Sequence, residues 1–227
     1  MNKKLILFDI DGTLISPGPA ARKSISQAIE NYTGVPPNLQ IKDVAGLTDN
    51  LIVKNALEKN GKNVDDNVVI DNIVNEYIEL FSIAYSKSDG AFVYEDSIKL
   101  IEKVKSHGIP LALLTGNVKR GAEIKLGKFD LMRHFTFGAF ADDGETRNDL
   151  PPIAKKLADE KFGISFKSEN IVLVGDTPED AIAAKFNGCK SIVVCRREEW
   201  YDEIIAAGTD LIVDSLDDPQ IEKEFLS

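Results

Sequence analysis

The stretch LILFDIDGTL, residues 5–14, joins an apolar run to two closely spaced carboxylates. The four apolar residues at 5–8 do not alternate with polar ones, which is typical of a strand buried on both faces of a parallel sheet. Asp9 and Asp11 follow at once, and two like charges this close repel each other where the strand leaves the core. The cluster therefore predicts a cation at the carboxyl end of this strand.

Similar apolar runs recur along the chain, and helical patterns separate them. The further runs lie at 109–115, 170–176, 191–195 and 211–213. Helical spacing of apolar residues covers 97–107, 149–162 and 177–187. Strands and helices that alternate in this way predict an α/β fold, a doubly wound Rossmann-like parallel sheet with helices on both faces.

Residues 16–88 interrupt this alternation. They contain three helical patterns and no comparable apolar run, and the turn-forming sequences SPGP at 16–19 and KSDG at 87–90 bracket them. The sequence therefore predicts a core domain made of 1–15 and 89–227, with 16–88 inserted as an α-helical cap domain.

Polar side chains follow three of the predicted strands. In open parallel sheets the carboxyl ends of the strands meet at one edge, where ligands bind, so we expect these side chains to converge. Carboxylates gathered there favour a hard cation such as Mg²⁺. The candidates are Asp9 and Asp11, then Thr115, Gly116 and Asn117, and then Asp176 and Asp180.

The same three stretches carry a family resemblance. LILFDIDGTL, ALLTGN at 112–117 and VLVGDTPEDA at 172–181 resemble the first, second and fourth motifs of the haloacid dehalogenase (HAD) superfamily. They are similar, more narrowly, to its phosphoglycolate-phosphatase-like members, over the whole chain and including a helical cap between the first two motifs. The resemblance implies the HAD fold and a Mg²⁺-dependent phosphatase that hydrolyses a small phosphorylated metabolite through an aspartyl-phosphate intermediate.

The resemblance also implies roles for the carboxylates. Asp9 would be the nucleophile that attacks phosphorus. Asp11 would be the general acid for the leaving alcohol and then the general base for the hydrolytic water. The Mg²⁺ ion would be held by Asp9, the backbone carbonyl of Asp11, and Asp176.

Phosphoryl oxygens would bind to Thr115 and to the neighbouring groups of Gly116 and Asn117. Simple capping of the following helix is the alternative for Thr115. Asp180 lies three residues after Thr177, so it is either a capping-box partner or a support behind the metal ligands.

The third motif departs from the family pattern. The family normally has a lysine there, often followed by proline, and the region FADDGETRNDLPPIAKKL at 140–157 contains no Lys-Pro. Arg147 stands where that lysine is expected and is predicted to contact the nucleophile and the phosphate. Lys155 and Lys128 are the rivals for this role.

The cap should select the substrate. The sequence AGLTDN at 45–50 interrupts two helical patterns with a glycine, which predicts a loop over the crevice. Thr48, Asp49 and Arg22 are the candidates for substrate contact, although Thr48 and Asp49 can equally well cap and support the next helix.

Two other functions remain open. A β-phosphoglucomutase-like phosphomutase would share the helical cap, but such enzymes usually carry an aliphatic residue where Thr13 lies. A noncatalytic phosphate-binding or regulatory module would gain nothing from Asp9 and Asp11 together. Asp11 argues against a dehalogenase, and the cap lysines Lys23 and Lys54 lack the context that a phosphonate hydrolase needs.

Composition narrows the range of partners. The chain has 227 residues and a net charge of −10, with 43% hydrophobic and 28% charged residues. This charge repels nucleic acid and anionic membranes, so we expect a small phosphorylated metabolite as partner and a monomer or homodimer. The two cysteines, Cys189 and Cys195, lie beside an apolar run, and we interpret them as small core residues. Without a signal-peptide core or an apolar span, a cytoplasmic location is expected.

Overall fold

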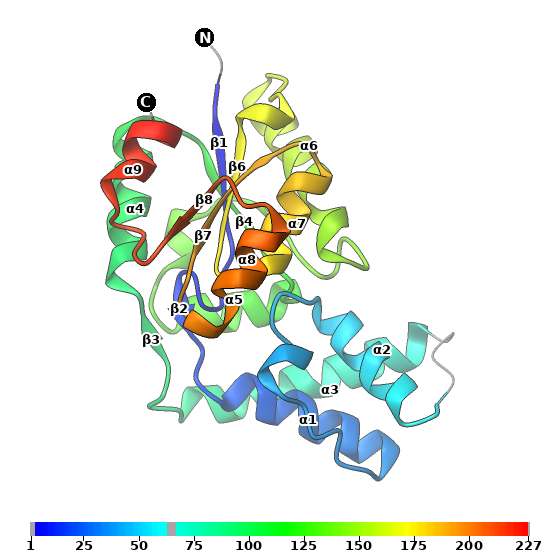
Figure 1. The fold of residues 1–227 in the computed structure, drawn as a ribbon. Coiled ribbons are helices and arrows are strands. Elements are labelled where there is room, and N and C mark those ends of the chain that lie inside the picture. The colour runs from blue at the N-terminus through cyan, green and yellow to red at the C-terminus, as the bar shows by residue number, and fades with distance from the viewer. Residues whose placement is uncertain (1–2, 63–66, 227) are drawn as a thin grey trace.

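The computed structural model describes residues 3–62 and 67–226. Within these residues a six-stranded sheet has the order β5-β4-β1-β6-β7-β8, and every neighbouring pair is parallel (Figure 1). The strands are β1 (Leu5–Phe8), β4 (Leu111–Leu114), β5 (Gly138–Ala139), β6 (Ile171–Gly175), β7 (Lys190–Val194) and β8 (Leu211–Val213). The first strand of the chain therefore lies inside the sheet, between β4 and β6.

Both faces of the sheet are buried because successive side chains of each strand point to opposite sides. On β1, Ile6 and Phe8 enter one hydrophobic cluster, whereas Leu5 and Leu7 enter another. The first face packs against α4 (Glu95–Ser106), α5 (Lys119–Gly127) and α9 (Pro219–Ile221). The second face packs against α6 (Leu150–Phe162), α7 (Pro178–Phe186) and α8 (Tyr201–Ala207). The predicted doubly wound parallel sheet is confirmed.

A separate layer of helices lies beyond the carboxyl ends of the strands (Figure 1). Its members are α1 (Ala20–Thr33), α2 (Asp49–Lys59) and α3 (Asn67–Ser86). They share a hydrophobic cluster that also includes Val118 and Ala141 of the core. Ile25, Val53 and Phe81 are buried members of this cluster, one from each helix. We call these helices and the loop 41–48 the cap layer.

The chain passes between the two layers twice, at neighbouring places. β2 (Ile15–Ser16) and β3 (Phe92–Val93) form a short antiparallel pair at these crossings. The crossings lie near the predicted limits of the cap, and the division into 1–15 with 89–227 and 16–88 stays a prediction.

One element of this fold matters for the site and has a weak sequence signal. A helix was expected after Thr115, but the extent of α5 was not predicted, because it is short and its inward face carries Lys125 between Ala122 and Leu126. Both cysteines are free and half-buried. Within 3–62 and 67–226, no helix combines the length and apolar character needed to cross a bilayer.

Candidate active site

The strand order brings the three predicted strand ends together. β1 is hydrogen-bonded to β4 on one side and to β6 on the other. A cavity of about 170 Å³ lies at this edge, between the sheet and the cap layer. The core contributes Asp9, Asp11, Thr115, Gly116, Asn117, Lys125 and Arg147 to its wall. The cap side contributes mainly apolar residues, with Arg22, Asp49 and Tyr77 as the polar ones.

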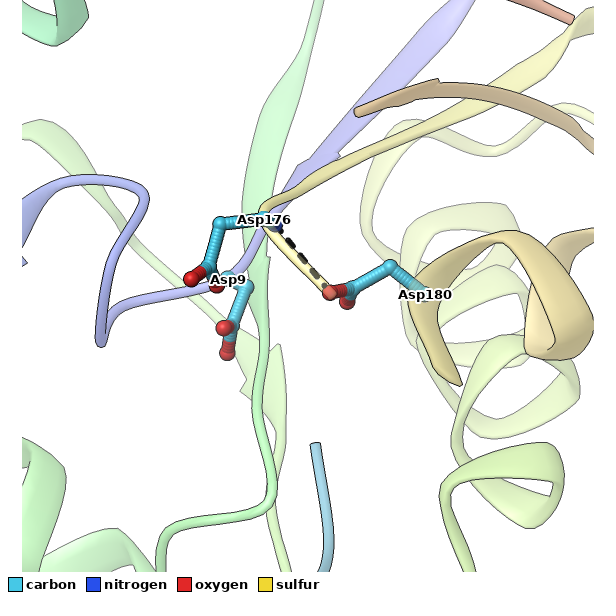
Figure 2. A group of neighbouring side chains, drawn as sticks. All are labelled: Asp9, Asp176 and Asp180. Atoms are coloured by element: carbon cyan, nitrogen blue, oxygen red, sulfur yellow. Dashed lines mark hydrogen bonds between the residues drawn. The ribbon is translucent and has the colours of Figure 1, made fainter. Parts of the chain in front are cut away.

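Three buried carboxylates form a compact group beside the cavity, and Asp9 is the member that lines it. Asp9, Asp176 and Asp180 each place an oxygen within 4.8 Å of the others. Figure 2 shows Asp9 and Asp176 on adjacent strand ends, with Asp180 reaching toward them from α7. Burial raises the pKa of Asp9 to about 6 and, together with the neighbouring carboxylates, raises the pKa of Asp176 well above its ordinary range.

This group fits a divalent cation. The Asp176 Oδ1 atom is buried and has no hydrogen-bond partner among the described residues, an arrangement that a metal ligand would relieve. Carboxylate oxygens are the donors that Mg²⁺ prefers. Gly12 makes room for Asp176: its φ is +79°, and a Cβ there would lie 2.0 Å from Asp176 Oδ2. Mg²⁺ itself, and Asp9, Asp11 and Asp176 as its ligands, stay predictions.

Arg147 contacts Asp9, the candidate nucleophile, and its role in place of the motif lysine stays a prediction. Its Nη2 atom is 3.0 Å from Asp9 Oδ1, contacts Asp180 Oδ1, and lies 3.5 Å from the Leu114 carbonyl oxygen. The guanidinium is 6% exposed, and the two carboxylates raise its pKa despite burial. One nitrogen of the delocalised guanidinium thus contacts two buried acids. The rivals lie elsewhere: Lys155 pairs with Asp159, and Lys128 donates to backbone carbonyls at 85 and 88.

Asp180 has the contacts of a capping-box residue and also contacts Arg147, while its role behind the metal ligands stays a prediction. Its Oδ2 atom accepts hydrogen bonds from the backbone nitrogens of Asp176 and Thr177 and from the Thr177 hydroxyl. Its Oδ1 atom contacts Arg147. Asp180 therefore caps α7 and at the same time holds the charged end of Arg147 beside Asp9.

The carboxylate of Asp11 is turned away from the three-acid group. Its Oδ2 atom accepts a hydrogen bond of 3.1 Å from Asn117 Nδ2 and contacts Lys125 Nζ. Asn117 Nδ2 also donates to Thr115 Oγ1 at 2.8 Å, so Thr115 keeps its own hydroxyl proton for another acceptor. Lys125 was missed by the sequence reasoning. The signal was a lysine on the apolar face of a helix whose extent was not predicted, at i+3 from Ala122.

The residues of the cap layer that were predicted to contact substrate lie in different places. Arg22 lines the cavity and donates from Nη1 to the Leu39 carbonyl oxygen at 3.0 Å. Thr48 is fully buried and does not line the cavity; its hydroxyl caps α2 and donates to the Glu145 carbonyl oxygen at 2.7 Å. For Thr48 the geometry therefore favours the capping alternative, and substrate contact by these residues stays a prediction.

Asp49 joins the cap layer to the core through two hydrogen bonds. Its backbone nitrogen donates to the Gly116 carbonyl oxygen at 2.8 Å, and its Oδ2 atom accepts from the Val118 nitrogen at 2.8 Å. Gly116 permits this approach, since a Cβ there would lie 2.1 Å from the Leu47 carbonyl oxygen. The cap layer is docked on the loop that follows β4.

Comparison with known proteins decides the family. A family model described as "Haloacid dehalogenase-like hydrolase" matches residues 6–194. The chain belongs to the haloacid dehalogenase-like hydrolases. Both the predicted superfamily and the predicted hydrolytic enzyme are thereby confirmed.

Relatives of this HAD hydrolase include named phosphatases. It is 25% identical over 217 residues to a phosphoglycolate phosphatase of Vibrio parahaemolyticus, covering 94% of this chain and 92% of that one. Among solved structures, a hydrolase from Pseudomonas syringae matches with a TM-score of 0.74 at 16% identity, covering 99% of each chain. CbbY from Rhodobacter sphaeroides, in complex with phosphate, matches with a TM-score of 0.71 at 21% identity over 95% of this chain and 96% of that one.

The acidic group predicts how the HAD hydrolase responds to metal. Mg²⁺ that binds only the folded protein at 100 times its Kd should stabilise it by about 2.7 kcal/mol, or roughly 5–10 °C in Tm. Asp176→Asn removes a buried like charge, so we expect a higher Tm than wild type in EDTA and little shift with Mg²⁺. Thermal unfolding during a Mg²⁺ titration measures both. Asp202→Asn, at an exposed position on α8, is the control, and equal Mg²⁺ shifts in wild type and Asp176→Asn would contradict the assignment.

Asp49 predicts a pH dependence of stability. Burial raises its pKa in the folded protein to about 6, from an ordinary 3.8. Between these values the folded chain binds more protons than the unfolded chain, so this group's contribution to the free energy of unfolding falls as pH rises. Asp49→Asn lacks this titration and keeps an acceptor for the Val118 nitrogen. Relative to wild type, we expect it to gain up to about 3 kcal/mol between about pH 4 and 7.

Urea unfolding in EDTA across this pH range measures the difference between the two proteins. Asp202→Asn should track wild type at every pH, because that carboxylate is exposed. A wild-type-minus-variant difference that does not change with pH would show that Asp49 does not carry a raised pKa.

Proposed function

We propose that this HAD hydrolase is a Mg²⁺-dependent phosphatase that hydrolyses a small phosphomonoester through an aspartyl-phosphate on Asp9. The observation that carries the proposal is that two carboxylates on one cavity have different partners. Asp9 faces Arg147, while Asp11 faces Lys125 and Asn117. Two acids in separate surroundings can take separate roles, one as nucleophile and one as proton carrier.

In the first step, a carboxylate oxygen of Asp9 forms a bond to phosphorus while the bond from phosphorus to the ester oxygen breaks. The carboxyl of Asp11 gives its proton to the departing oxygen, so the product leaves as a neutral alcohol. Arg147 keeps the Asp9 carboxylate oriented through its 3.0 Å contact to Oδ1. Thr115, Gly116 and Asn117 line the cavity, and in this proposal they donate hydrogen bonds to phosphoryl oxygens.

In the second step, water attacks phosphorus and its proton returns to Asp11. The bond between phosphorus and Asp9 breaks, and inorganic phosphate leaves. When bound, Mg²⁺ supplies positive charge that offsets the repulsion between the Asp9 carboxylate and the phosphoryl group. Asp9 and Asp176 would hold it, together with the backbone carbonyl of Asp11. The docked cap layer excludes bulk water from this chemistry.

A substrate of the phosphoglycolate class is part of the proposal. The curated relative from Vibrio parahaemolyticus bears that name. A cavity of about 170 Å³ suits a small ligand, since it lies below the roughly 300–1,000 Å³ common for drug-sized molecules. Arg22, on the cap side, is a cation that could meet a carboxylate at the far end of such a substrate.

The test is release of inorganic phosphate from phosphoglycolate, p-nitrophenyl phosphate and a panel of small phosphomonoesters, with Mg²⁺ and with EDTA. Release with Mg²⁺ that stops in EDTA supports the proposal. Phosphate that moves to another hydroxyl of a sugar phosphate and stays organic would indicate the phosphomutase. Binding of phosphate with no turnover of any panel member would indicate the noncatalytic module.

A further inference from the structure

We infer that Lys125 is a positioning residue that holds the carboxyl of Asp11 in place for proton transfer to the leaving group. The inference rests on the proposed phosphatase function. Lys125 occupies a core-facing position on α5, and its side chain is only 2% exposed. A buried ammonium without a partner is strongly unfavourable, so its contacts indicate why it is there.

The contacts of Lys125 lead to the proton carrier. Its Nζ atom contacts Asp11 Oδ2 and donates a hydrogen bond to Asn117 Oδ1. Asn117 in turn donates to Asp11 Oδ2 at 3.1 Å. The three side chains close a ring of contacts in which two donors converge on one carboxylate oxygen.

No other hydrogen bond holds this carboxylate among the described residues. Asp11 Oδ1 is buried and has no hydrogen-bond partner there. The direction of the Asp11 side chain therefore depends on the two donors at Oδ2. Without Lys125, the carboxylate could rotate toward Asp9 and Asp176, where it would no longer face the leaving group.

The cap layer completes the surroundings of Lys125. The Phe81 ring of α3 lies with its centroid 5.7 Å from Nζ, which is within cation–π range. Asp49, from α2, is also a neighbouring charge that acts on this site. Docking of the cap layer thus removes water from the ammonium and strengthens its hold on Asp11. Lys125 belongs to the core yet reaches its full effect only with the cap in place.

The proton-transfer step shows which measurement isolates this role. The O–H bond of the Asp11 carboxyl breaks as the proton moves to the ester oxygen, and the electron pair of the breaking phosphorus–oxygen bond stays on that oxygen. A weakly basic leaving group such as p-nitrophenolate needs little help from an acid, whereas the more basic phenolate needs it. The two aryl phosphates have the same phosphoryl group and nearly the same shape, so their comparison reports on proton transfer alone.

The experiment compares kcat/KM for phenyl phosphate and p-nitrophenyl phosphate in wild type, Lys125→Met and Asp11→Asn, with Mg²⁺ present. General acids contribute about 10²–10⁴-fold. We expect Lys125→Met to lose roughly 10²-fold on phenyl phosphate and less than about tenfold on p-nitrophenyl phosphate, the same pattern as Asp11→Asn. Lys155→Met, which removes a lysine paired on the surface of α6, should leave both rates unchanged.

Asn117→Ala is the second variant, because loss of a buried lysine can prevent folding. It removes the other donor to Asp11 Oδ2 and keeps the buried ion pair. The ratio of the two substrates cancels any effect on phosphate binding, so the same selective loss is expected. Equal losses on both substrates, in every variant that folds, would overturn the inference. Absence of phosphate release by wild type would instead overturn the proposed function, and the inference with it.

Discussion

Asp9→Asn should lower phosphate release by about 10⁴-fold or more, because the amide is a far weaker nucleophile toward phosphorus than the carboxylate. The fold should survive. Burial already raises the pKa of Asp9 to about 6, which means that the folded protein disfavours the charge that the substitution removes. We therefore expect equal or higher Tm in EDTA together with loss of activity. Phosphate release under single-turnover and steady-state conditions, with Tm on the same samples, measures both.

Asp202→Asn is the matched control for this experiment. It makes the same chemical change at an exposed position of α8, outside the residues that line the cavity. It should retain full activity. If Asp9→Asn kept activity within about tenfold of wild type, Asp9 would not be the nucleophile and the aspartyl-phosphate mechanism would fail.

Arg147→Met should produce the largest loss of stability in the site. Arg147 carries the positive charge between Asp9 and Asp180, and all three groups are buried. Removing one member of a buried ion pair costs about 3–5 kcal/mol, because the remaining charges lose their compensation. Activity should fall with it by about 10²–10³-fold, since the Asp9 carboxylate loses the group that orients it. Chemical unfolding and phosphate release measure the two effects.

Arg147→Lys keeps the positive charge of the side chain but removes the planar guanidinium. All three contacts of Arg147 are made by Nη2, so the arginine acts here through a single nitrogen. A lysine ammonium supplies one nitrogen with three donors. We expect this variant to recover most of the stability and to lose only about tenfold in activity. Addition of Mg²⁺ should partly restore the stability of Arg147→Met, because a cation in the acidic group replaces some of the missing charge.

The result for the lysine variant also decides whether arginine is a true replacement for the lysine of the family's third motif. Stability and activity as low in Arg147→Lys as in Arg147→Met would show that the planar guanidinium is essential. Unchanged stability in both variants would show that Arg147 does not compensate Asp9 and Asp180.

Local pattern was enough to predict most of the fold. The run at 5–8 and its counterparts around 111–114 and 171–175 are apolar without alternation, because both faces of a central parallel strand are covered. The helices of the cap layer could be predicted from the spacing of their apolar residues alone. Two elements had no clear sequence pattern. Strand β5 has only two residues, and helix α5 carries a buried lysine on its apolar face.

The residues of the candidate site could also be predicted only in part from the sequence. Asp9 and Asp176 could be named from sequence because each directly follows a buried strand, and Asp11 because it lies two residues after Asp9. The rule that such strand ends converge needs no coordinates. Arg147 could be named as a partner of Asp9, 138 positions away, only through the resemblance to the family's third motif. Lys125, the partner of Asp11, could not be named, because no periodicity relates residues 114 positions apart.

The sequence by itself determined the class of fold, the family and the acids at the strand ends, since these depend on short-range order along the chain. Only the tertiary structure decided which charge compensates which acid. In the folded protein Asp11 contacts Lys125 and Asn117, whereas Asp9 and Asp176 lie together with Asp180. Thr48 lies in the junction between the cap layer and the core. The physical reason is that the energy of a buried charge depends on what surrounds it in space, and those surroundings come from segments that are far apart along the chain.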